Sequence, residues 1–410
     1  MSELKGSCIL GQSGGPTAVI NASAQGVIET ALKAGCITKV LGAAHGIKGV
    51  LADELFDMGQ ESPGELALLR YTPSSALGSC RYKLAEPAKD DTDYKRILEV
   101  FKKYDVRYFF YNGGNDSMDT CNKISKYMQS VGYECRIIGV PKTIDNDLNG
   151  TDHCPGYGSA AKYIATSFME VWQDAHVYDT GEVTVVEAMG RHAGWLTGAA
   201  GLASYAGYGP DLLYLPEVNF DMEIFLKDVA DIYGRTGKCF VGVSEGIHYA
   251  DGTFVSEAKA SATDGFGHAQ LGGLAAMLAD AVKQKTGAKV RGIELSLLQR
   301  CGAHLASKAD NDEAYLAGKA AVEAAVSGVT DMMVAFECTR EGGYSCRTKL
   351  IPLTEAANAE KKVPRDWINA AGNGILKPFV DYALPLIQGE PDRPLEQSLP
   401  RFVKLKKVRA

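Results

Sequence analysis

Short apolar segments alternate along this chain with longer segments in which apolar residues recur every three to four positions. The two kinds of segment predict buried strands and helices in turn. Strands are expected near 7–10, 106–111, 135–140, 183–188, 238–243, 290–298 and 332–336. Helices are expected at 17–34, with Gly35 as its C-terminal cap, and near 118–128. This order predicts an α/β fold with doubly wound, mainly parallel sheets, in which ligands bind at the carboxyl ends of the strands.

The chain is long enough for two domains. Its 410 residues can bury a large core. Turn-forming pairs at Asn149-Gly150 and Pro155-Gly156 mark candidate boundaries. From about Pro385 the sequence is rich in proline and charge, which predicts a solvated tail or an arm that lies on another subunit.

Composition argues against several classes of function. Hydrophobic residues make up 46% of the chain, and the formal net charge of -7 disfavours nucleic acid or an anionic membrane as partner. No apolar run reaches the roughly 18 residues of a membrane span and the N-terminus lacks a signal-peptide pattern, so we expect a cytoplasmic protein. The ten cysteines include no Cys-x-x-Cys pair and the seven histidines no His-x-x-x-His pair. Free, mostly buried thiols and no structural zinc site are therefore expected.

The densest chemistry follows the predicted strand 135–140. There, the run Pro141-Lys142-Thr143-Ile144-Asp145-Asn146-Asp147 brings one lysine and two carboxylates together. A carboxylate at the C-terminal end of a strand can accept a proton from a bound hydroxyl, and a lysine three residues earlier can hold a phosphate. The run therefore indicates phosphoryl transfer to an alcohol.

Two glycine-rich turns, each between a predicted strand and a helix, are candidates for phosphate binding. Residues 11–16 read Gly-Gln-Ser-Gly-Gly-Pro, and residues 113–117 read Gly-Gly-Asn-Asp-Ser. Glycine lets the backbone approach an anion, and a helix N-terminus adds partial positive charge. Such turns also occur without ligands, and Asp116 or Ser117 can simply cap a helix, so the turns alone leave both interpretations open.

Three further segments complete a set of motifs: Met189-Gly190-Arg191, Ser244-Glu245-Gly246 and Gln299-Arg300. With the two turns and the Thr-Ile-Asp-Asn-Asp run, in this order over residues 6 to about 340, the chain resembles the phosphofructokinase family. The resemblance implies the phosphofructokinase fold, two doubly wound Rossmann-like α/β domains with the active site in the cleft between them. It also implies phosphoryl transfer to the 1-hydroxyl of fructose 6-phosphate, with Mg²⁺ as cofactor.

The resemblance further implies how the chain is divided. A donor domain, for pyrophosphate and magnesium, is expected from 1–155 plus about 300–355. A sugar-phosphate domain is expected from 156–299 plus about 356–385. Residues 386–410 are then a C-terminal tail.

Site roles follow from the family motifs, residue by residue. Asp145 is expected to take the proton from the sugar 1-hydroxyl and Arg300 to bind the 6-phosphate. The expected catalytic residues are Lys142, Thr143, Asp145, Asp147 and Arg191. Donor binding is expected from Gly11, Gly14, Gly15, Arg81, Gly114, Asn115, Asp116, Ser117 and Lys142. Substrate binding is expected from Thr143, Asp145, Met189, Gly190, Arg191, Glu245, Arg291 and Arg300, and metal binding from Asn115 and Asp147.

Two residues point to pyrophosphate rather than ATP as the phosphoryl donor. ATP-dependent members of the family have glycines where this chain has Asp116 and Lys142, and this pair resembles the pyrophosphate-dependent branch. Asp116 would crowd and repel the α-phosphate of ATP, whereas Lys142 adds a charge that binds the shorter donor. Two like charges about 4 Å apart repel by roughly 4 kcal/mol at an effective dielectric of 20, about a thousandfold in preference. The resemblance also implies a reversible reaction.

The chain departs from the family pattern at two informative positions. Asn115 stands where the family has a metal-binding aspartate, so a contact there would use a neutral carbonyl oxygen. Glu182 stands where ATP enzymes have an arginine that reaches in from a neighbouring subunit. Lys83 and Lys162 are candidates to replace that charge.

Alternatives remain at this stage. The same fold could use ATP, or the chain could be a catalytically silent subunit that binds sugar phosphates, against which the retained Asp145 argues. Sedoheptulose 7-phosphate shares the reacting end of fructose 6-phosphate and stays open as a second acceptor. We expect a homodimer or homotetramer, because phosphate-binding arginines such as Arg291 are often contributed across subunit interfaces in this family.

Overall fold

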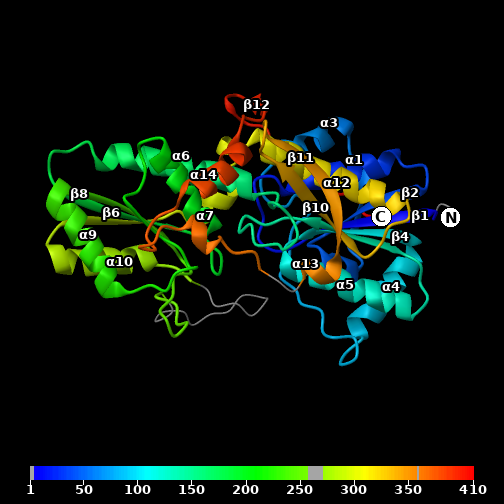
Figure 1. The fold of residues 1–410 in the computed structure, drawn as a ribbon. Coiled ribbons are helices and arrows are strands. Elements are labelled where there is room, and N and C mark those ends of the chain that lie inside the picture. The colour runs from blue at the N-terminus through cyan, green and yellow to red at the C-terminus, as the bar shows by residue number, and fades with distance from the viewer. Residues whose placement is uncertain (1–3, 257–270, 358–359) are drawn as a thin grey trace.

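Two β-sheets organise the chain into two lobes that lie side by side (Figure 1). The computed structural model describes residues 4–256, 271–357 and 360–410. The larger sheet has the strand order β11-β10-β5-β4-β1-β2-β3, and the smaller has the order β7-β8-β6-β9. The predicted α/β class is therefore confirmed.

The strands of the larger sheet are mainly parallel, with antiparallel strands at its two edges. They are β1 (Gly6–Gln12), β2 (Ile37–Ala43), β3 (Leu55–Asp57), β4 (Val106–Gly113), β5 (Arg136–Pro141), β10 (Met332–Thr339) and β11 (Ser345–Pro352). The smaller sheet is entirely parallel. It comprises β6 (Glu182–Ala188), β7 (Leu212–Tyr214), β8 (Lys238–Ser244) and β9 (Lys289–Glu294).

Alternating side chains of each central strand enter two different cores. In β1, Ile9 packs on one face of the sheet, and its neighbours Cys8 and Leu10 pack on the other. Helices cover both faces, so the central strands are almost entirely buried and mainly apolar, as is typical of doubly wound sheets. The main helices are α1 (Ile20–Lys33), α4 (Thr92–Lys103), α5 (Asn115–Ser130), α6 (Tyr157–Ala175), α9 (Met222–Thr236), α10 (Leu274–Thr286) and α12 (Lys308–Val326).

The chain crosses between the lobes more than once. Helix α12 returns to the first lobe and lies directly against α1, where a Cβ on Gly26 would lie 2.2 Å from the carbonyl oxygen of Tyr315. The segment after residue 360, with α14 (Lys377–Ala383), then packs in the core of the second lobe. Shorter helices are α2 (Ile47–Ala52), α3 (Pro63–Leu68), α7 (Trp195–Ala199), α8 (Gly201–Tyr205), α11 (Leu298–Cys301) and α13 (Leu353–Ala356).

Three predictions about individual elements are wrong. Ala34, in an extended conformation, ends α1, and Gly35 does not adopt the left-handed conformation of a glycine cap. The strand expected at 290–298 ends at Glu294, and α11 begins at Leu298. The C-terminal segment lies on its own first lobe: backbone N–H groups of Lys404, Lys406 and Lys407 donate to glutamates there, and Val403 packs on the core.

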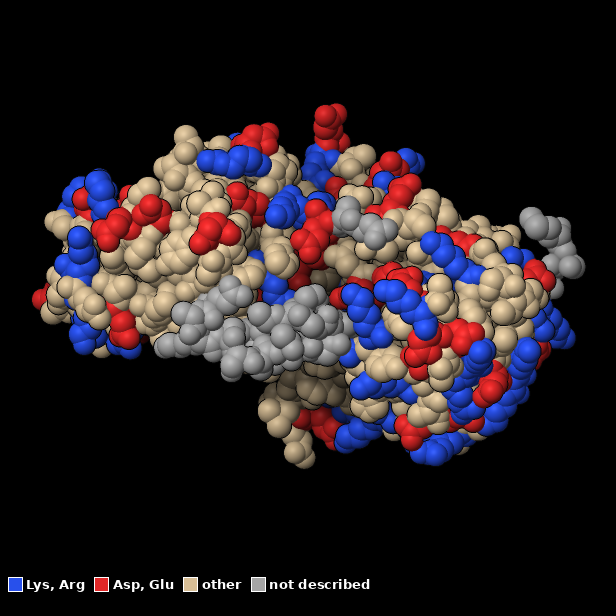
Figure 2. All heavy atoms as spheres, turned by 90° about the horizontal axis from the view of Figure 1, so that it is seen from below, with Lys and Arg blue, Asp and Glu red and all other residues tan. Residues whose placement is uncertain are grey.

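One face of the molecule carries charges of both signs. On the side shown in Figure 2, Lys and Arg side chains are interspersed with Asp and Glu over the lobe that carries α4 and α5. Among the described residues, none of the helices combines the length and apolar composition that a bilayer crossing needs. The expected free thiols are confirmed, since all ten cysteines are unbridged and most are buried.

Candidate active site

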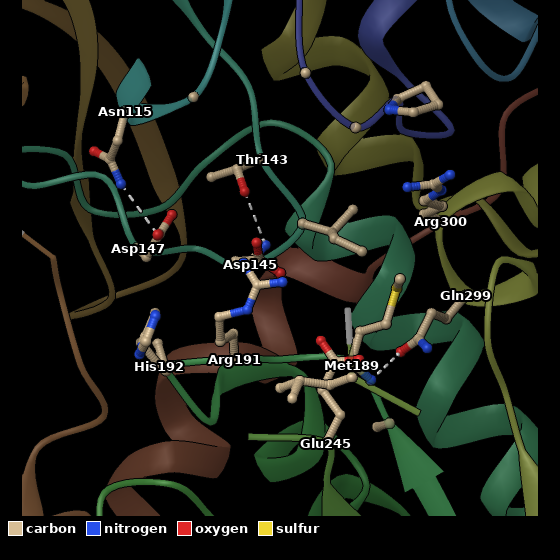
Figure 3. A pocket seen from close by; sticks show the side chains of 18 of the residues that line it. Asn115, Thr143, Asp145, Asp147, Met189, Arg191, His192, Glu245, Gln299 and Arg300 are labelled. Atoms are coloured by element: carbon tan, nitrogen blue, oxygen red, sulfur yellow. Dashed lines mark hydrogen bonds between the residues drawn. The ribbon is translucent and has the colours of Figure 1, made fainter. Parts of the chain in front are cut away.

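A cavity of about 840 Å³ lies where the carboxyl ends of strands from both sheets meet. The first lobe contributes the segments after β1, β4 and β5, and the second contributes those after β6, β8 and β9. Figure 3 shows Asn115, Thr143, Asp145 and Asp147 facing Met189, Arg191 and Glu245 across this space. The position is the one that doubly wound sheets predict for a ligand.

Three cations converge on the glycine turn after β1. The Lys142 side chain is only 3% exposed, and its Nζ donates to the carbonyl oxygen of Gly15 over 2.7 Å. A Cβ on Gly15 would lie 3.3 Å from Nη1 of Arg300 and 3.7 Å from Nη2 of Arg81. Gly14 has a φ of +76°, and a Cβ there would lie 3.2 Å from Nζ of Lys142. The backbone conformation of Gly14 therefore favours glycine, and the turn lies in a cationic cradle suited to phosphate groups.

The second glycine turn leads into α5 and carries a candidate metal site. A Cβ on Gly113 would collide with Ser117, so this glycine is required by packing. Asn115, the first residue of α5, donates its Nδ2 to Oδ2 of Asp147 over 3.1 Å. Its other amide atom, Oδ1, is buried without a hydrogen-bond partner. An unpartnered carbonyl oxygen beside a carboxylate suits a hard cation such as Mg²⁺.

The loop after β5 is held in place by buried hydrogen bonds. Asn146 has a left-handed φ of 56° and is fully buried. Its Nδ2 donates to the Tyr382 hydroxyl over 2.7 Å, and its Oδ1 accepts the Cys154 N–H. The Thr143 hydroxyl accepts the N–H of Asp145. These contacts fix Asp145 and Asp147 on either side of Asn146.

The second lobe presents main-chain and polar groups to the same cavity. Gln299 accepts the Met189 N–H at Oε1 over 3.1 Å, and Glu245 accepts the Gly190 N–H over 3.3 Å. Gly190 has a φ of 135°, which favours glycine, and its N–H and carbonyl groups tie the Met-Gly-Arg turn to the end of β8. Hydrogen-bonding groups in this arrangement are suited to sugar hydroxyls and phosphates.

Burial shifts the pKa values of several ionisable groups in the cavity. It raises the pKa of Asp145, although the charge of Lys142 opposes the effect. Burial, with the charges of Asp145 and Glu360, raises the pKa of Asp147 to about 7. Burial also lowers the pKa of Lys142 to about 8 and raises that of Glu245 to about 7. Such shifts cluster at functional sites, where a general base is most effective with a pKa near neutrality.

The cavity brings together all the predicted site residues except three. Gly11 lies inside β1, where a Cβ would meet the ring of Tyr111 at 2.7 Å, so its glycine is explained by packing. Gly190 acts through its backbone and does not line the cavity. Arg291 lies on the exposed edge strand β9, where its Nε donates to Glu182 over 2.7 Å. Candidate residues Lys83 and Lys162 do not line the cavity either.

Several lining residues were not anticipated from the sequence. Glu360 reaches the cavity from the C-terminal segment, which pairs there with Leu148. His192 also lines the cavity, as do Glu187 and Glu294 at the ends of β6 and β9. For Glu187 and Glu294, the one available signal was a carboxylate near the C-terminal end of a strand.

Comparisons with known proteins agree with these motifs. A profile of the family described as Phosphofructokinase matches residues 7–325. The chain is 47% identical over 402 residues to a Halomonas elongata protein and 48% identical over 412 residues to a Xanthomonas campestris protein. Both relatives are named pyrophosphate–fructose 6-phosphate 1-phosphotransferase, and the matches cover 97% and 98% of this chain and 96% and 97% of theirs. The structure of the pyrophosphate-dependent phosphofructokinase from Marinobacter aquaeolei matches with a TM-score of 0.89 at 42% identity, covering 99% of this chain and 97% of that one.

Proposed function

The chain belongs to the phosphofructokinase family, and on that premise we propose that it transfers a phosphoryl group reversibly from pyrophosphate to the 1-hydroxyl of fructose 6-phosphate. The products are fructose 1,6-bisphosphate and phosphate. The relatives that are nearly half identical over almost the whole chain carry the name of this reaction. One cavity gathers a buried carboxylate, a cationic cradle and hydrogen-bonding groups that suit a sugar phosphate, which supports the proposal.

The observation that carries the choice of donor is the burial of Lys142 against the first glycine turn. Its ammonium group lies on the Gly15 carbonyl, at the loop that would hold the donor phosphates. Asp116, in the first turn of α5, lines the same cavity. Pyrophosphate can bind the Lys142 ammonium group without approaching the Asp116 carboxylate, whereas a nucleotide would have to extend its α-phosphate toward that carboxylate.

Asp145 is proposed as the general base. It stands between Thr143 and Arg191 in the cavity (Figure 3), where a sugar hydroxyl can approach it. As the hydroxyl attacks, Asp145 takes its proton, and Lys142 and Arg81 hold the negative charge of the donor. Arg300 and Glu245 orient the sugar through its 6-phosphate and hydroxyls, so that the reacting oxygen lies near the donor.

The residues present fit a magnesium ion. Asn115 Oδ1 and the Asp147 carboxylate would hold it, and Glu360 adds negative charge nearby. When bound, Mg²⁺ would neutralise charge on the donor phosphates. Asp147 and Asn115 are thus assigned to metal binding, and Asp145 to proton transfer.

The remaining assignments concern the whole molecule. The lobe with β1, β4 and β5 is proposed as the donor domain, and the lobe with β6, β8 and β9 as the sugar-phosphate domain. We propose that the protein is cytoplasmic and forms a homo-oligomer. The oligomer is supported by the exposed edge strand β9 and by the adjacent Leu297 and Leu298, which are 52% and 59% exposed. In such an assembly Arg291 could act at a neighbouring site.

The reverse reaction tests the proposal without any nucleotide. Purified protein supplied with fructose 1,6-bisphosphate, phosphate and Mg²⁺ should form pyrophosphate and fructose 6-phosphate, both detectable with coupled assays. The Asp145→Asn variant should form neither at a comparable rate. If the wild-type protein forms no pyrophosphate under these conditions, the proposed reaction is wrong.

A further inference from the structure

A cluster of thiols and charged groups lies outside the cavity, at the end of the β10–β11 hairpin. Cys338 is near the end of β10, and Cys346 is near the start of the edge strand β11. His153, just after the Asp145 loop, lies beside them. None of these three residues lines the active-site cavity.

The two cysteines are placed for a direct bond. Cys338 and Cys346 are directly paired residues in the antiparallel ladder, so their side chains lie on the same face of the hairpin. Directly opposed residues of such a ladder have Cα atoms about 4.5–5.5 Å apart. Disulfides span Cα separations of about 4.4–6.8 Å, so a bridge here needs little backbone movement.

His153 sits between two carboxylates and one of the thiols. It is 1% exposed, its Nδ1 lies 3.0 Å from Asp152 Oδ1, and its Nε2 lies 2.7 Å from Glu313 Oε2. The Cys338 sulfur lies 3.8 Å from Nδ1. Burial opposes protonation, but hydrogen bonds to Asp152, Cys338 and Glu313 raise the pKa of His153 well above its usual value. The sulfur therefore faces a cationic ring.

The surrounding groups shift the pKa values of the two thiols in opposite directions. The hydrogen bond from Cys346, with that from His153, lowers the pKa of Cys338 to about 6 despite partial burial. The same hydrogen bond raises the pKa of Cys346. Tyr344, whose hydroxyl is 3.6 Å from the Cys338 sulfur, donates to Glu313, and Arg340 pairs with Asp152. These contacts favour the thiolate of Cys338 and the protonated thiol of Cys346, which is the arrangement of redox-active cysteine pairs.

We propose that Cys338 and Cys346 are a site of reversible oxidation by hydroperoxides, which joins β10 to β11 through a disulfide. The Cys338 thiolate attacks hydrogen peroxide: an S–O bond forms, the O–O bond breaks, and hydroxide leaves to become water. The Cys346 sulfur then displaces the hydroxyl group from Cys338, forming the S–S bond while its own proton leaves with that group as water. The two sulfurs together lose two electrons, and an external dithiol returns them.

Access and selectivity support this assignment. Both sulfurs belong to partly exposed residues at the edge of the sheet, so a small oxidant can reach them. By contrast, burial raises the pKa of Cys8, Cys121 and Cys154. Within the described part of the chain, this is the only pair of cysteines that combines direct strand pairing with a charged histidine.

A metal ion is the competing occupant, and the geometry favours it less. Among the described residues, two triads have atoms close enough together to hold a metal ion: Asp152 with His153 and Cys338, and His153 with Glu313 and Cys346. Both ring nitrogens of His153 already contact carboxylates, and the two sulfurs belong to different triads. A tetrahedral ion would have to displace these contacts.

The test uses the reduced full-length protein and substoichiometric to excess hydrogen peroxide. Peptide mapping under non-reducing conditions should find a Cys338–Cys346 disulfide that dithiothreitol reverses, with the other eight cysteines unchanged. Iodoacetamide should alkylate Cys338 with a midpoint near pH 6, and at least tenfold faster than Cys135 at pH 7. These measurements do not require enzyme turnover, so their outcome is independent of whether the proposed reaction is correct.

Variants separate the two steps of oxidation. Cys346→Ser should stop at a sulfenic acid on Cys338 that dimedone traps, whereas Cys135→Ser should form the disulfide like the wild type; circular dichroism confirms that each is folded. Equal alkylation rates for Cys338 and Cys135, or peroxide treatment that leaves Cys338 and Cys346 unlinked, would overturn the proposal. So would a stoichiometric zinc ion, found by elemental analysis, that protects both thiols.

Discussion

At the scale of single residues, the account depends first on Asp145 as the base. We expect Asp145→Ser to lower kcat by about two to four orders of magnitude, because a serine hydroxyl cannot accept the proton at that position. Binding of fructose 6-phosphate, measured by calorimetry, should persist because Arg300 and Glu245 remain. Asp231→Asn, on the exposed face of α9, is the control and should leave both quantities unchanged. Wild-type turnover in Asp145→Ser would remove the residue from the mechanism.

Asp116 is the residue expected to exclude ATP. Asp116→Gly should raise kcat/KM for ATP, by up to about a thousandfold if the whole repulsion is relieved, and should change kcat/KM for pyrophosphate much less. Asp116→Asn keeps the volume and removes the charge, so the two variants separate crowding from repulsion. Asp119→Asn serves as control, because Asp119 lies on the same helix but pairs with Lys123. No gain in ATP use by either Asp116 variant would contradict the role.

Glu245 should make stability depend on pH. Its pKa rises from 4.5 to about 7 on folding, so between these values the unfolded chain loses the proton first and the folded state is destabilised as pH rises. The effect amounts to about 3 kcal/mol at most. In denaturant unfolding, the free energy of unfolding of Glu245→Gln should therefore increase relative to that of the wild type from pH 5 to pH 8. The exposed Glu99→Gln should show no such trend, and a pH-independent difference for Glu245→Gln would refute the shift.

Local patterns in the sequence identified much of the site and left some of it hidden. Lys142 and Asp145 were recognisable because they directly follow a buried strand, where ligands bind. Glu360 was not, because it reaches the cavity only through the tertiary path of the C-terminal segment. Gly11 was assigned to ligand binding because it belongs to the glycine-rich turn. The sequence does not show whether such a glycine faces a phosphate or, as here, the ring of Tyr111.

At the scale of elements, α14 supports the loop that carries Asp145. The Tyr382 hydroxyl accepts from Asn146 and donates to the Asp152 carbonyl over 2.8 Å, although it does not line the cavity. We expect Tyr382→Phe to cost about 1–3 kcal/mol in unfolding free energy, because Asn146 loses a buried partner. Loosening of the loop should lower kcat by about ten- to a hundredfold.

The control for this change is another tyrosine. Tyr205→Phe alters a side chain that is 66% exposed at the end of α8, and it should change neither stability nor turnover. Chemical denaturation and steady-state kinetics measure the two effects. If Tyr382→Phe behaves like Tyr205→Phe, the loop is positioned by other contacts.

Helix and strand order was predictable because apolar periodicity is local, whereas element ends were not. The strand expected at 290–298 was extended too far because Leu295, Leu297 and Leu298 continue an apolar run, yet the last two are exposed. The tail after Pro385 reads as solvated, but its fixation depends on distant glutamates of the first lobe, such as Glu61 and Glu65. Such long-range pairing leaves no periodic signal.

At the scale of the whole molecule, each half of the reaction is assigned to a different lobe. The donor cradle around Gly14 and Gly15 belongs to the first sheet, and Glu245 and Met189 belong to the second. Arg300 lies in the segment that leads from the second sheet back into α12, and its guanidinium reaches Gly15 of the first lobe. The relative placement of the lobes therefore sets the distance between donor and acceptor.

The central claim, that a buried lysine and an acidic helix start select an inorganic donor, is tested most directly by donor preference. The measurement is kcat/KM of the wild-type protein for pyrophosphate and for ATP, with fructose 6-phosphate saturating, in one coupled assay. The account predicts a preference for pyrophosphate of about a thousandfold. Efficient phosphorylation by ATP with no activity toward pyrophosphate would contradict it.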